Sequence, residues 1–197
     1  MALAARTLPP ERDDVIALRG ATWADYQRVL EIRGDAPAPR LTYLRGTLEL
    51  MNPSRRHESI KSTIGCLVEA WCVERGIEIS PYGSWTLDDA ASERAIEPDE
   101  CYVLGDVEEP ERPDLAIEVF WTSGRLDRLE VYRTLGVREV WIWKQGTITP
   151  WILRGERYEA VAQSEVLGGI DLAALARFVD TKPTTRAVRE YLRALRG

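Results

Sequence analysis

Two acidic residues, Asp99 and Glu118, stand within the apolar, strand-like segments EPDECYVLG and PDLAIEVFW. A structural strand does not need these carboxylates, and a buried carboxylate must be paired, hydrogen-bonded or metal-bound because an isolated buried charge is very costly. Carboxylates that meet from two strands can bind a divalent metal, which polarises a phosphate and lowers the pKa of a bound water. We therefore predict that Asp99 and Glu118 meet in space and bind a divalent metal.

The partner of Glu118 must come from another strand. Asp114 lies on the same face of the same segment, but residues four apart in a strand are separated by roughly 13 Å. Oxygen ligands must lie about 2.0–2.1 Å from Mg²⁺, so Asp99 is the better candidate and Asp114 is interpreted as a strand-entry residue. The alternative interpretation of Glu118 is a sheet-end acid that is solvated or ion-paired with an arginine.

The clearest helix of the chain begins with His57 and Glu58 and covers residues 57–75. Its apolar residues recur at helical spacing, and Pro53 and Ser54 precede it as start signals. Negative charge in the first turn suits the helix dipole, so Glu58 has a sufficient structural explanation. His57 is interpreted as a surface residue rather than a metal ligand.

The remaining patterns predict alternating strands and helices around these residues. Strands are expected over residues 100–105 and 114–121, followed by a helix over residues 124–135 that Ser123 would cap. Elsewhere the sequence predicts a helix over residues 23–33 capped by Thr22, hairpins around Arg45–Gly46 and Gln145–Gly146, a bent strand over residues 77–87, a strand over residues 158–161, and helices over residues 172–178 and 185–195.

The fold class expected from this order is α/β (α+β), with one central sheet and helices against it. A chain of 197 residues suits one domain. Residues 1–20 are expected to form a flexible N-terminal arm, and residues 21–197 a single domain. The 45% of hydrophobic residues and 29% of charged residues predict a globular protein rather than a disordered one.

Charge and cysteine content narrow the function classes. The formal net charge of −6 argues against a protein that coats nucleic acid nonspecifically, but it does not exclude a nuclease. Three cysteines without a CxxC pair and a single histidine disfavour a zinc site. The odd cysteine count and the lack of a signal peptide predict a cytoplasmic protein, and no apolar run is long enough to span a membrane.

Three segments carry a resemblance to a known family. They are YLRGTLELMNPS with the following HE at residues 43–58, EPDECYVLG at residues 97–105, and PDLAIEVFWTSGRLDRLEVYRTLGVREVWIW at residues 113–143. Together with the surroundings of Tyr158 they cover about residues 20–160. Their order and spacing resemble the Uma-two family of restriction-endonuclease-like proteins, within the PD-(D/E)XK nuclease superfamily.

The resemblance implies a restriction-endonuclease-like fold, in which helices flank a central mixed sheet and acids line a cleft at one edge. It implies that Asp99 is the metal-binding aspartate and that Glu118 is the glutamate of the second motif. Glu58 would complete the metal shell directly or through water. The implied cofactor is Mg²⁺ or Mn²⁺, and the implied partner is DNA.

This sequence departs from the family at one position. The family usually has a lysine one helical turn before a tyrosine, which is Tyr132 here, and Arg128 stands in its place. Phe120 occupies the ordinary lysine position two residues after Glu118. Arg128 can supply positive charge and hydrogen bonds, but it cannot act as a general base because its pKa stays above ~12. Lys61, one turn after Glu58, is the alternative active-site cation.

Three function hypotheses follow from these residues. The first is a metal-dependent endonuclease that hydrolyses DNA phosphodiester bonds. The second is a catalytically weak or inactive nuclease-fold protein that binds nucleic acid or a protein partner, which Arg128 and the acidic balance favour. The third is a small metal-dependent hydrolase with another substrate. A basic strip around the cleft would favour the first two, with the candidate residues Arg55, Arg56, Arg125 and Arg128.

Two further interpretations concern assembly and the tryptophans. A homodimer is left open, by analogy with superfamily nucleases that pair to cut both strands. Trp141 and Trp143 share a parity within one strand and are expected in the core, whereas Trp121 is retained as a candidate cleft-wall residue.

Overall fold

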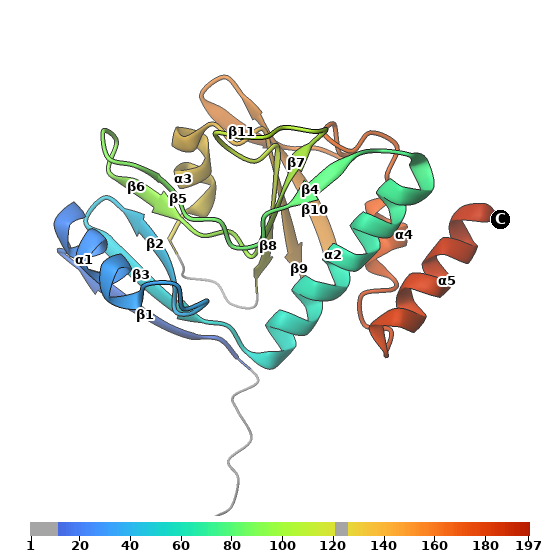
Figure 1. Ribbon diagram of the computed structural model, residues 1–197, viewed down its shortest axis with the longest axis horizontal. Coiled ribbons are helices and arrows are strands. Elements are labelled where there is room, and N and C mark those ends of the chain that lie inside the picture. Colours follow the sequence, from blue (N-terminus) through green and yellow to red (C-terminus); the bar gives the residue numbers. More distant parts are fainter. Residues whose placement is uncertain (1–11, 121–125) are drawn as a thin grey trace, which may run out of the picture.

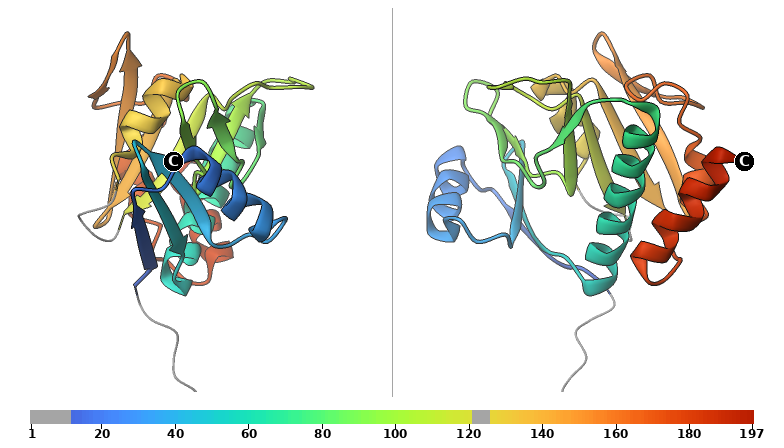
Figure 2. Two further views of the ribbon diagram at one scale, coloured as in Figure 1. Left: turned by 90° about the vertical axis from the view of Figure 1, so that its left-hand side faces the viewer. Right: turned by 45° about the vertical axis from the view of Figure 1, so that its right-hand side comes forward.

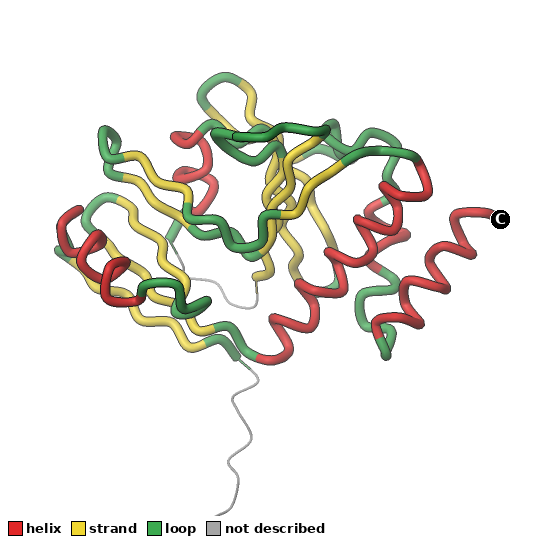
Figure 3. The backbone as a smooth tube through the Cα atoms, in the orientation of Figure 1, coloured by secondary structure: helices red, strands yellow, loops and turns green. Residues whose placement is uncertain are grey.

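The computed structural model describes residues 12–120 and 126–197. Within these ranges the chain forms two β-sheets and five helices. Figures 1 and 3 show how these elements are arranged. The mixed α/β class expected from the sequence is confirmed, but two sheets replace the single central sheet. No helix in the described ranges is long and apolar enough to cross a membrane.

The smaller sheet is antiparallel throughout and carries α1 (Trp23–Arg33) against one face. Both predicted capping elements of α1 are present, because Thr22 and Asp25 form a capping box and Gly34 follows the last turn. The strands of this sheet, in spatial order, are β1 (Asp14–Arg19), β3 (Thr47–Asn52), β2 (Arg40–Leu44), β6 (Arg94–Ile96) and β5 (Leu87–Asp89).

The larger sheet contains the one parallel pair among the described strands, β8 with β9. The connection between them carries α3 (Arg128–Leu135), as a parallel pair requires a crossover. The spatial order of its strands is β11 (Arg157–Ala160), β10 (Thr147–Arg154), β9 (Glu139–Lys144), β8 (Leu115–Phe120), β7 (Glu100–Leu104) and β4 (Ile79–Pro81).

Both predicted hairpins form. Arg45 and Gly46 join β2 to β3 with φ angles of 48° and 78°, and Gln145 and Gly146 join β9 to β10 with φ angles of 49° and 84°. Two successive positive φ angles are the signature of a type I′ turn, whose twist matches that of the flanking strands. The glycine in each pair adopts this conformation without steric cost.

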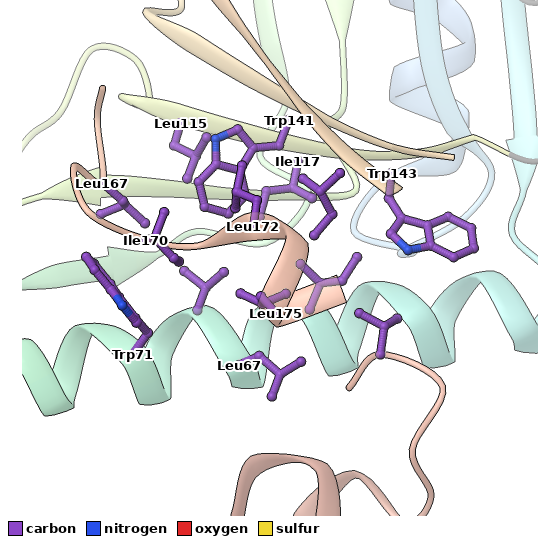
Figure 4. Packing of buried hydrophobic residues seen from close by; sticks show 14 of the residues in the cluster. Leu67, Trp71, Leu115, Ile117, Trp141, Trp143, Leu167, Ile170, Leu172 and Leu175 are labelled. Atoms are coloured by element: carbon purple, nitrogen blue, oxygen red, sulfur yellow. The ribbon is translucent and has the colours of Figure 1, made fainter. Parts of the chain in front are cut away.

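One face of the larger sheet packs against α2 (Arg55–Arg75) and α4 (Leu172–Ala176), and α5 (Thr184–Arg196) packs on α2. Figure 4 shows Trp141 and Trp143 of β9 on this side, together with Leu115 and Ile117 of β8. Trp141 and Trp143 are buried, so the expectation that they belong to the core is confirmed. Burial of such large rings contributes much of the apolar area that stabilises this layer.

The opposite face of the larger sheet packs against α3 and the edge of the smaller sheet. Alternation along β8 places Leu115, Ile117 and Val119 toward α2, while Ala116 packs toward α3. Glu118 shares the parity of Ala116 and therefore points into the space between the two sheets.

The structure corrects several boundaries. Residues 14–19 form β1, paired with β3, although the sequence analysis placed residues 1–20 in an arm. The helix expected over residues 124–135 begins at Arg128 with Asp127 as its N-cap; Ser123 lies outside the described residues. The bent strand expected over residues 77–87 is two short strands, β4 and β5, in different sheets.

Candidate active site

Asp99 lies directly before β7 and is completely buried, with no exposed side-chain surface. Its Oδ1 accepts a hydrogen bond from Nη1 of Arg40, the first residue of β2. Its Oδ2 lies 2.7 Å from the backbone nitrogen of Val119 in β8 and 2.9 Å from Nε2 of His57 in α2. One carboxylate thereby joins both sheets and the long helix.

Asp99 is ionised in this setting. Burial alone would raise the pKa of its carboxyl, but the hydrogen bond from His57 and the charges of His57, Arg40 and Arg128 hold that pKa below its usual range. Burial raises the pKa of the Glu118 carboxyl, and the nearby charge of Asp99 raises it further. Arg128 opposes that rise.

Glu118 is held by two residues of α3. Nη1 of Arg128 and the hydroxyl of Tyr132 both donate to its carboxylate, one to each oxygen. Nη2 of Arg128 lies 3.5 Å from Oε1 of Glu49 in β3, so the guanidinium sits between two buried carboxylates. Their charges outweigh the effect of burial and raise the pKa of Arg128 above its ordinary value.

Glu58 forms the more exposed side of the site, with 39% of its side chain accessible. Nη2 of Arg40 lies 2.6 Å from Oε1 of Glu58, while Nζ of Lys61 lies 3.2 Å from Oε2. Arg40 therefore bridges Glu58 and Asp99. Two groups of charged side chains thus contain the four candidate site residues from the sequence analysis: Arg40 joins Asp99 to Glu58, and Arg128 pairs with Glu118. The charges of Asp99 and Glu118 influence each other.

His57 is fully buried, so its interpretation as a surface residue was wrong. Its Nδ1 lies 3.0 Å from Oδ2 of Asp13, and its backbone nitrogen donates to the N-cap hydroxyl of Ser54. Burial opposes protonation of the imidazole, but the hydrogen bonds and charges of Asp13 and Asp99 outweigh it and raise the pKa of His57 to about 9. At neutral pH His57 is a buried cation between two aspartates.

The stability of the metal-free protein should therefore fall as pH rises from about 6.5 to about 9. The pKa of His57 is raised from 6.5 to about 9 on folding, so its contribution is complete below the unfolded pKa and is lost as pH passes the folded pKa. At 1.36 kcal/mol per pKa unit the loss approaches about 3 kcal/mol. Urea unfolding across this pH range would measure it.

The matched variant is His57→Gln, which removes the only histidine of the chain. Its free energy of unfolding should change less between pH 6.5 and pH 9 than that of the wild type. If the free energies of unfolding of the two proteins change in parallel with pH, His57 is not charged in the folded state.

Sequence reasoning missed Arg40, Asp13 and Glu49, and it used Tyr132 only as a marker of the family pattern. Arg40 and Glu49 carried a usable signal, because charged residues are rarely buried and both stand in otherwise apolar strand segments. Asp13 carried none, since it reaches His57 from 44 residues away.

Other candidates lie elsewhere. Asp114 accepts hydrogen bonds from the backbone of Leu104 and from Arg138, as suits a strand-entry residue. Arg55 is exposed at the start of α2, whereas Arg128 is buried and cannot contribute to a surface strip. The candidates Trp121 and Arg125 lie outside the described residues.

The donor chemistry of the site suits a hard divalent cation. Carboxylates are the ligands that Mg²⁺ and Mn²⁺ prefer, and Oε1 of Glu49 is buried without a hydrogen bond beside Arg128. The guanidinium groups of Arg40 and Arg128 each lie between two carboxylates, as a compensating cation would. Within residues 12–120 and 126–197, no three acidic, histidine or cysteine side chains are grouped as a preformed metal site.

Comparisons with known proteins complete the description. A solved structure titled as a "putative nuclease belonging to DUF820" from Anabaena variabilis ATCC 29413 is similar at 13% identity, with a TM-score of 0.48, and the match covers 87% of this chain and 98% of the other. No curated protein matches the chain. The model of the Uma2 family, described as "Putative restriction endonuclease", matches residues 23–179. The chain therefore belongs to the Uma2 family of restriction-endonuclease-like proteins.

Proposed function

We propose that this protein is a metal-dependent endonuclease that hydrolyses DNA phosphodiester bonds, with Asp99, Glu118 and Glu58 as the metal-binding acids. The observation that carries the proposal is the convergence of these carboxylates. Asp99, directly before β7, and Glu118, in the neighbouring strand β8, are buried, and Arg40 links Asp99 to the accessible carboxylate of Glu58. The chain also belongs to the Uma2 family, which is described as "Putative restriction endonuclease", and this supports the same conclusion.

Bound Mg²⁺ or Mn²⁺ would supply phosphate polarisation and a water of lowered pKa. The residues of the chain supply the setting for that chemistry. Tyr132 and Arg128 fix the orientation of the Glu118 carboxylate by donating to both of its oxygens. Arg40 donates to Oδ1 of Asp99, while the Val119 amide and His57 lie against Oδ2. Side chains held in this way present their oxygens with little loss of conformational freedom.

Three cations have different roles in this proposal. Arg128 is buried and compensates Glu118, so it is a positioning residue rather than a group that meets the phosphate. Lys61 keeps 18% of its side chain exposed beside Glu58 and is better placed to meet an incoming anion. Arg40 shares Glu58 with Lys61 and would carry positive charge to the same edge of the site.

A second function is favoured by one specific observation. Both oxygens of Asp99 and both oxygens of Glu118 already lie against hydrogen-bond donors or cations of the protein. The buried charges are therefore largely compensated without a metal. This arrangement supports a nuclease-fold protein that binds nucleic acid or a protein partner without cleaving it.

Cleavage of supercoiled plasmid and of single-stranded DNA, with Mg²⁺ or Mn²⁺, separates the two functions. Glu118→Gln and Asp99→Asn should each reduce the cleavage rate by at least about 100-fold, since even residues that only support metal ligands are worth 10–100-fold. These amides keep the size of each side chain and can still accept hydrogen bonds, so the variants are better suited than alanine replacements.

The matched control is Glu130→Gln, which changes a partly buried acid of α3 that pairs with Arg133 and Arg45. It should cleave at the wild-type rate. Wild-type cleavage by both site variants would refute the assignment of Asp99 and Glu118. Absence of cleavage by the wild type with either metal, together with retained DNA binding, would support the binding function instead.

A further inference from the structure

We propose that the solvent-facing side of α5 is a docking surface for the phosphate backbone of a nucleic acid. This inference rests on the proposed function, since it names the surface that holds the substrate of the same site. The surface consists of Arg186, Arg189, Arg193 and Arg196, which we call the arginine face.

Helical spacing places these residues together. They follow one another at intervals of three, four and three residues, which keeps them on one side of an α-helix. All four are exposed, while Ala187 and Tyr191 on the other side are buried against the core that includes α2. From Arg186 to Arg193 the face extends about 10 Å along the helix axis.

The charge of α5 is opposite to that of the whole chain. The helix contains four arginines and one glutamate, a net charge of +3 (4 − 1), whereas the formal charge of the chain is −6. Arg196 pairs with Glu74 at 2.7 Å. No ion pair is recorded for Arg186, Arg189 or Arg193 with any residue in the described part of the chain. Three guanidinium groups are therefore available to an external anion.

The arginine face begins beside the helix that carries Glu58. Oγ1 of Thr184, the first residue of α5, lies 3.2 Å from Oγ1 of Thr63 in α2. Nζ of Lys182, just before α5, donates to Oγ of Ser59 at 2.6 Å. Figures 1 and 2 show the first turns of α5 beside the first half of α2. A long polyanion can thus extend from the active site to α5.

The chemistry of the face favours a nucleic acid over a membrane surface. A basic helix that binds membranes needs an apolar face to insert into the lipid, but the apolar face of α5 is already buried within the protein. Guanidinium groups are well suited to phosphate diesters because they donate paired hydrogen bonds and release counterions on binding. The negative charge of the rest of the chain would confine such contacts to this face.

The test is the salt dependence of DNA binding in EDTA, where cleavage is prevented. The probe is a short DNA duplex, with single-stranded DNA and an RNA duplex of the same sequence as comparisons. Replacing Arg186, Arg189 and Arg193 together with glutamine should weaken binding at low salt by at least tenfold. It should also reduce the slope of log affinity against log salt by about 2 to 3, since each phosphate contact contributes about 0.9.

Two variants make the result specific. A triple glutamine variant of Arg28, Arg138 and Arg157, which are exposed on other elements, removes the same net charge and should retain the wild-type slope. Replacement of the arginine face by lysines should also retain most of the slope. If both glutamine variants lose the same DNA affinity and slope, or neither loses any, the proposal is overturned.

Failure of this inference and failure of the proposed function give different results. The DNA-binding slope is measured in EDTA, so its dependence on the arginine face can be determined whether or not the wild type cleaves DNA with Mg²⁺ or Mn²⁺. Vesicles rich in anionic lipid test the membrane alternative. Loss of vesicle binding in the arginine-face variant, with unchanged DNA binding, would overturn the docking surface without bearing on hydrolysis.

Discussion

Replacing Arg128 with methionine should lower the free energy of unfolding by about 3–5 kcal/mol. The side chain of Arg128 is almost completely buried, and its guanidinium donates to Glu118 and lies near Glu49. Removing one partner of a buried ion pair leaves the other charge without compensation, which costs more than the pair itself contributes. Urea unfolding of the metal-free variant would measure the loss.

A double-mutant cycle isolates the charge pair. Adding Glu118→Gln to Arg128→Met removes the uncompensated carboxylate, so the double variant should recover part of the lost stability. Arg133→Met is the matched control, because Arg133 lies in the same helix and pairs with acids at the surface. It should cost less than about 1 kcal/mol.

The same variant also tests metal binding without relying on activity. If Glu118 binds Mg²⁺, the ion can replace the missing charge, and Mg²⁺ should stabilise Arg128→Met more than it stabilises the wild type. A cost below about 1 kcal/mol for Arg128→Met, with no coupling to Glu118→Gln, would mean that Glu118 is already uncharged in the folded protein.

Replacing Glu139 with alanine should lower the free energy of unfolding by about 3–6 kcal/mol. Glu139 has no exposed surface and accepts hydrogen bonds from the indole of Trp141 and from the backbone nitrogens of Glu165 and Val166, the latter two at 2.9 Å. The alanine variant would leave these donors buried and unpaired, and each unpaired donor costs about 1–3 kcal/mol.

Glu139→Gln keeps one oxygen of the same shape and should be destabilised less than Glu139→Ala. Glu165→Ala is a surface control, because the Glu165 side chain is half-exposed and pairs with exposed Arg154. Urea unfolding followed by tryptophan fluorescence and by circular dichroism would compare the three variants. Equal stability of Glu139→Ala and Glu165→Ala would show that the buried hydrogen bonds contribute nothing net.

The features that the sequence predicted are local ones. The capping box at Thr22, the turn at Arg45–Gly46 and the alternation along β8 depend on residues a few positions apart, so their chemistry can be read from short windows. The sequence analysis paired Asp99 with Glu118 because they stand in consecutive strand-like segments, and the strands of these segments, β7 and β8, are neighbours in the larger sheet.

The missed features depend on distant partners. His57 follows Ser54 at a helix start and has the local pattern of a surface residue, and only Asp13 and Asp99 make it a buried cation. β1 was missed because its pairing with β3 joins residues that are 28 to 38 positions apart in the sequence. The sequence analysis predicted Ser123 as the N-cap of the helix that begins at Arg128, but the N-cap is Asp127. Serine and aspartate both suit an N-cap, so local propensity could not decide between them.

The separation in sequence between the charged partners has a consequence for the order of folding. Arg40 and Asp99 are 59 residues apart, and His57 and Asp13 are 44 residues apart. Closing such long loops is entropically costly, so the local hairpins and helices should form first, while the charged groups remain hydrated. Contacts that form after the transition state mainly slow unfolding. We therefore expect these long-range ion pairs to slow unfolding and lengthen the lifetime of the native state, without speeding folding.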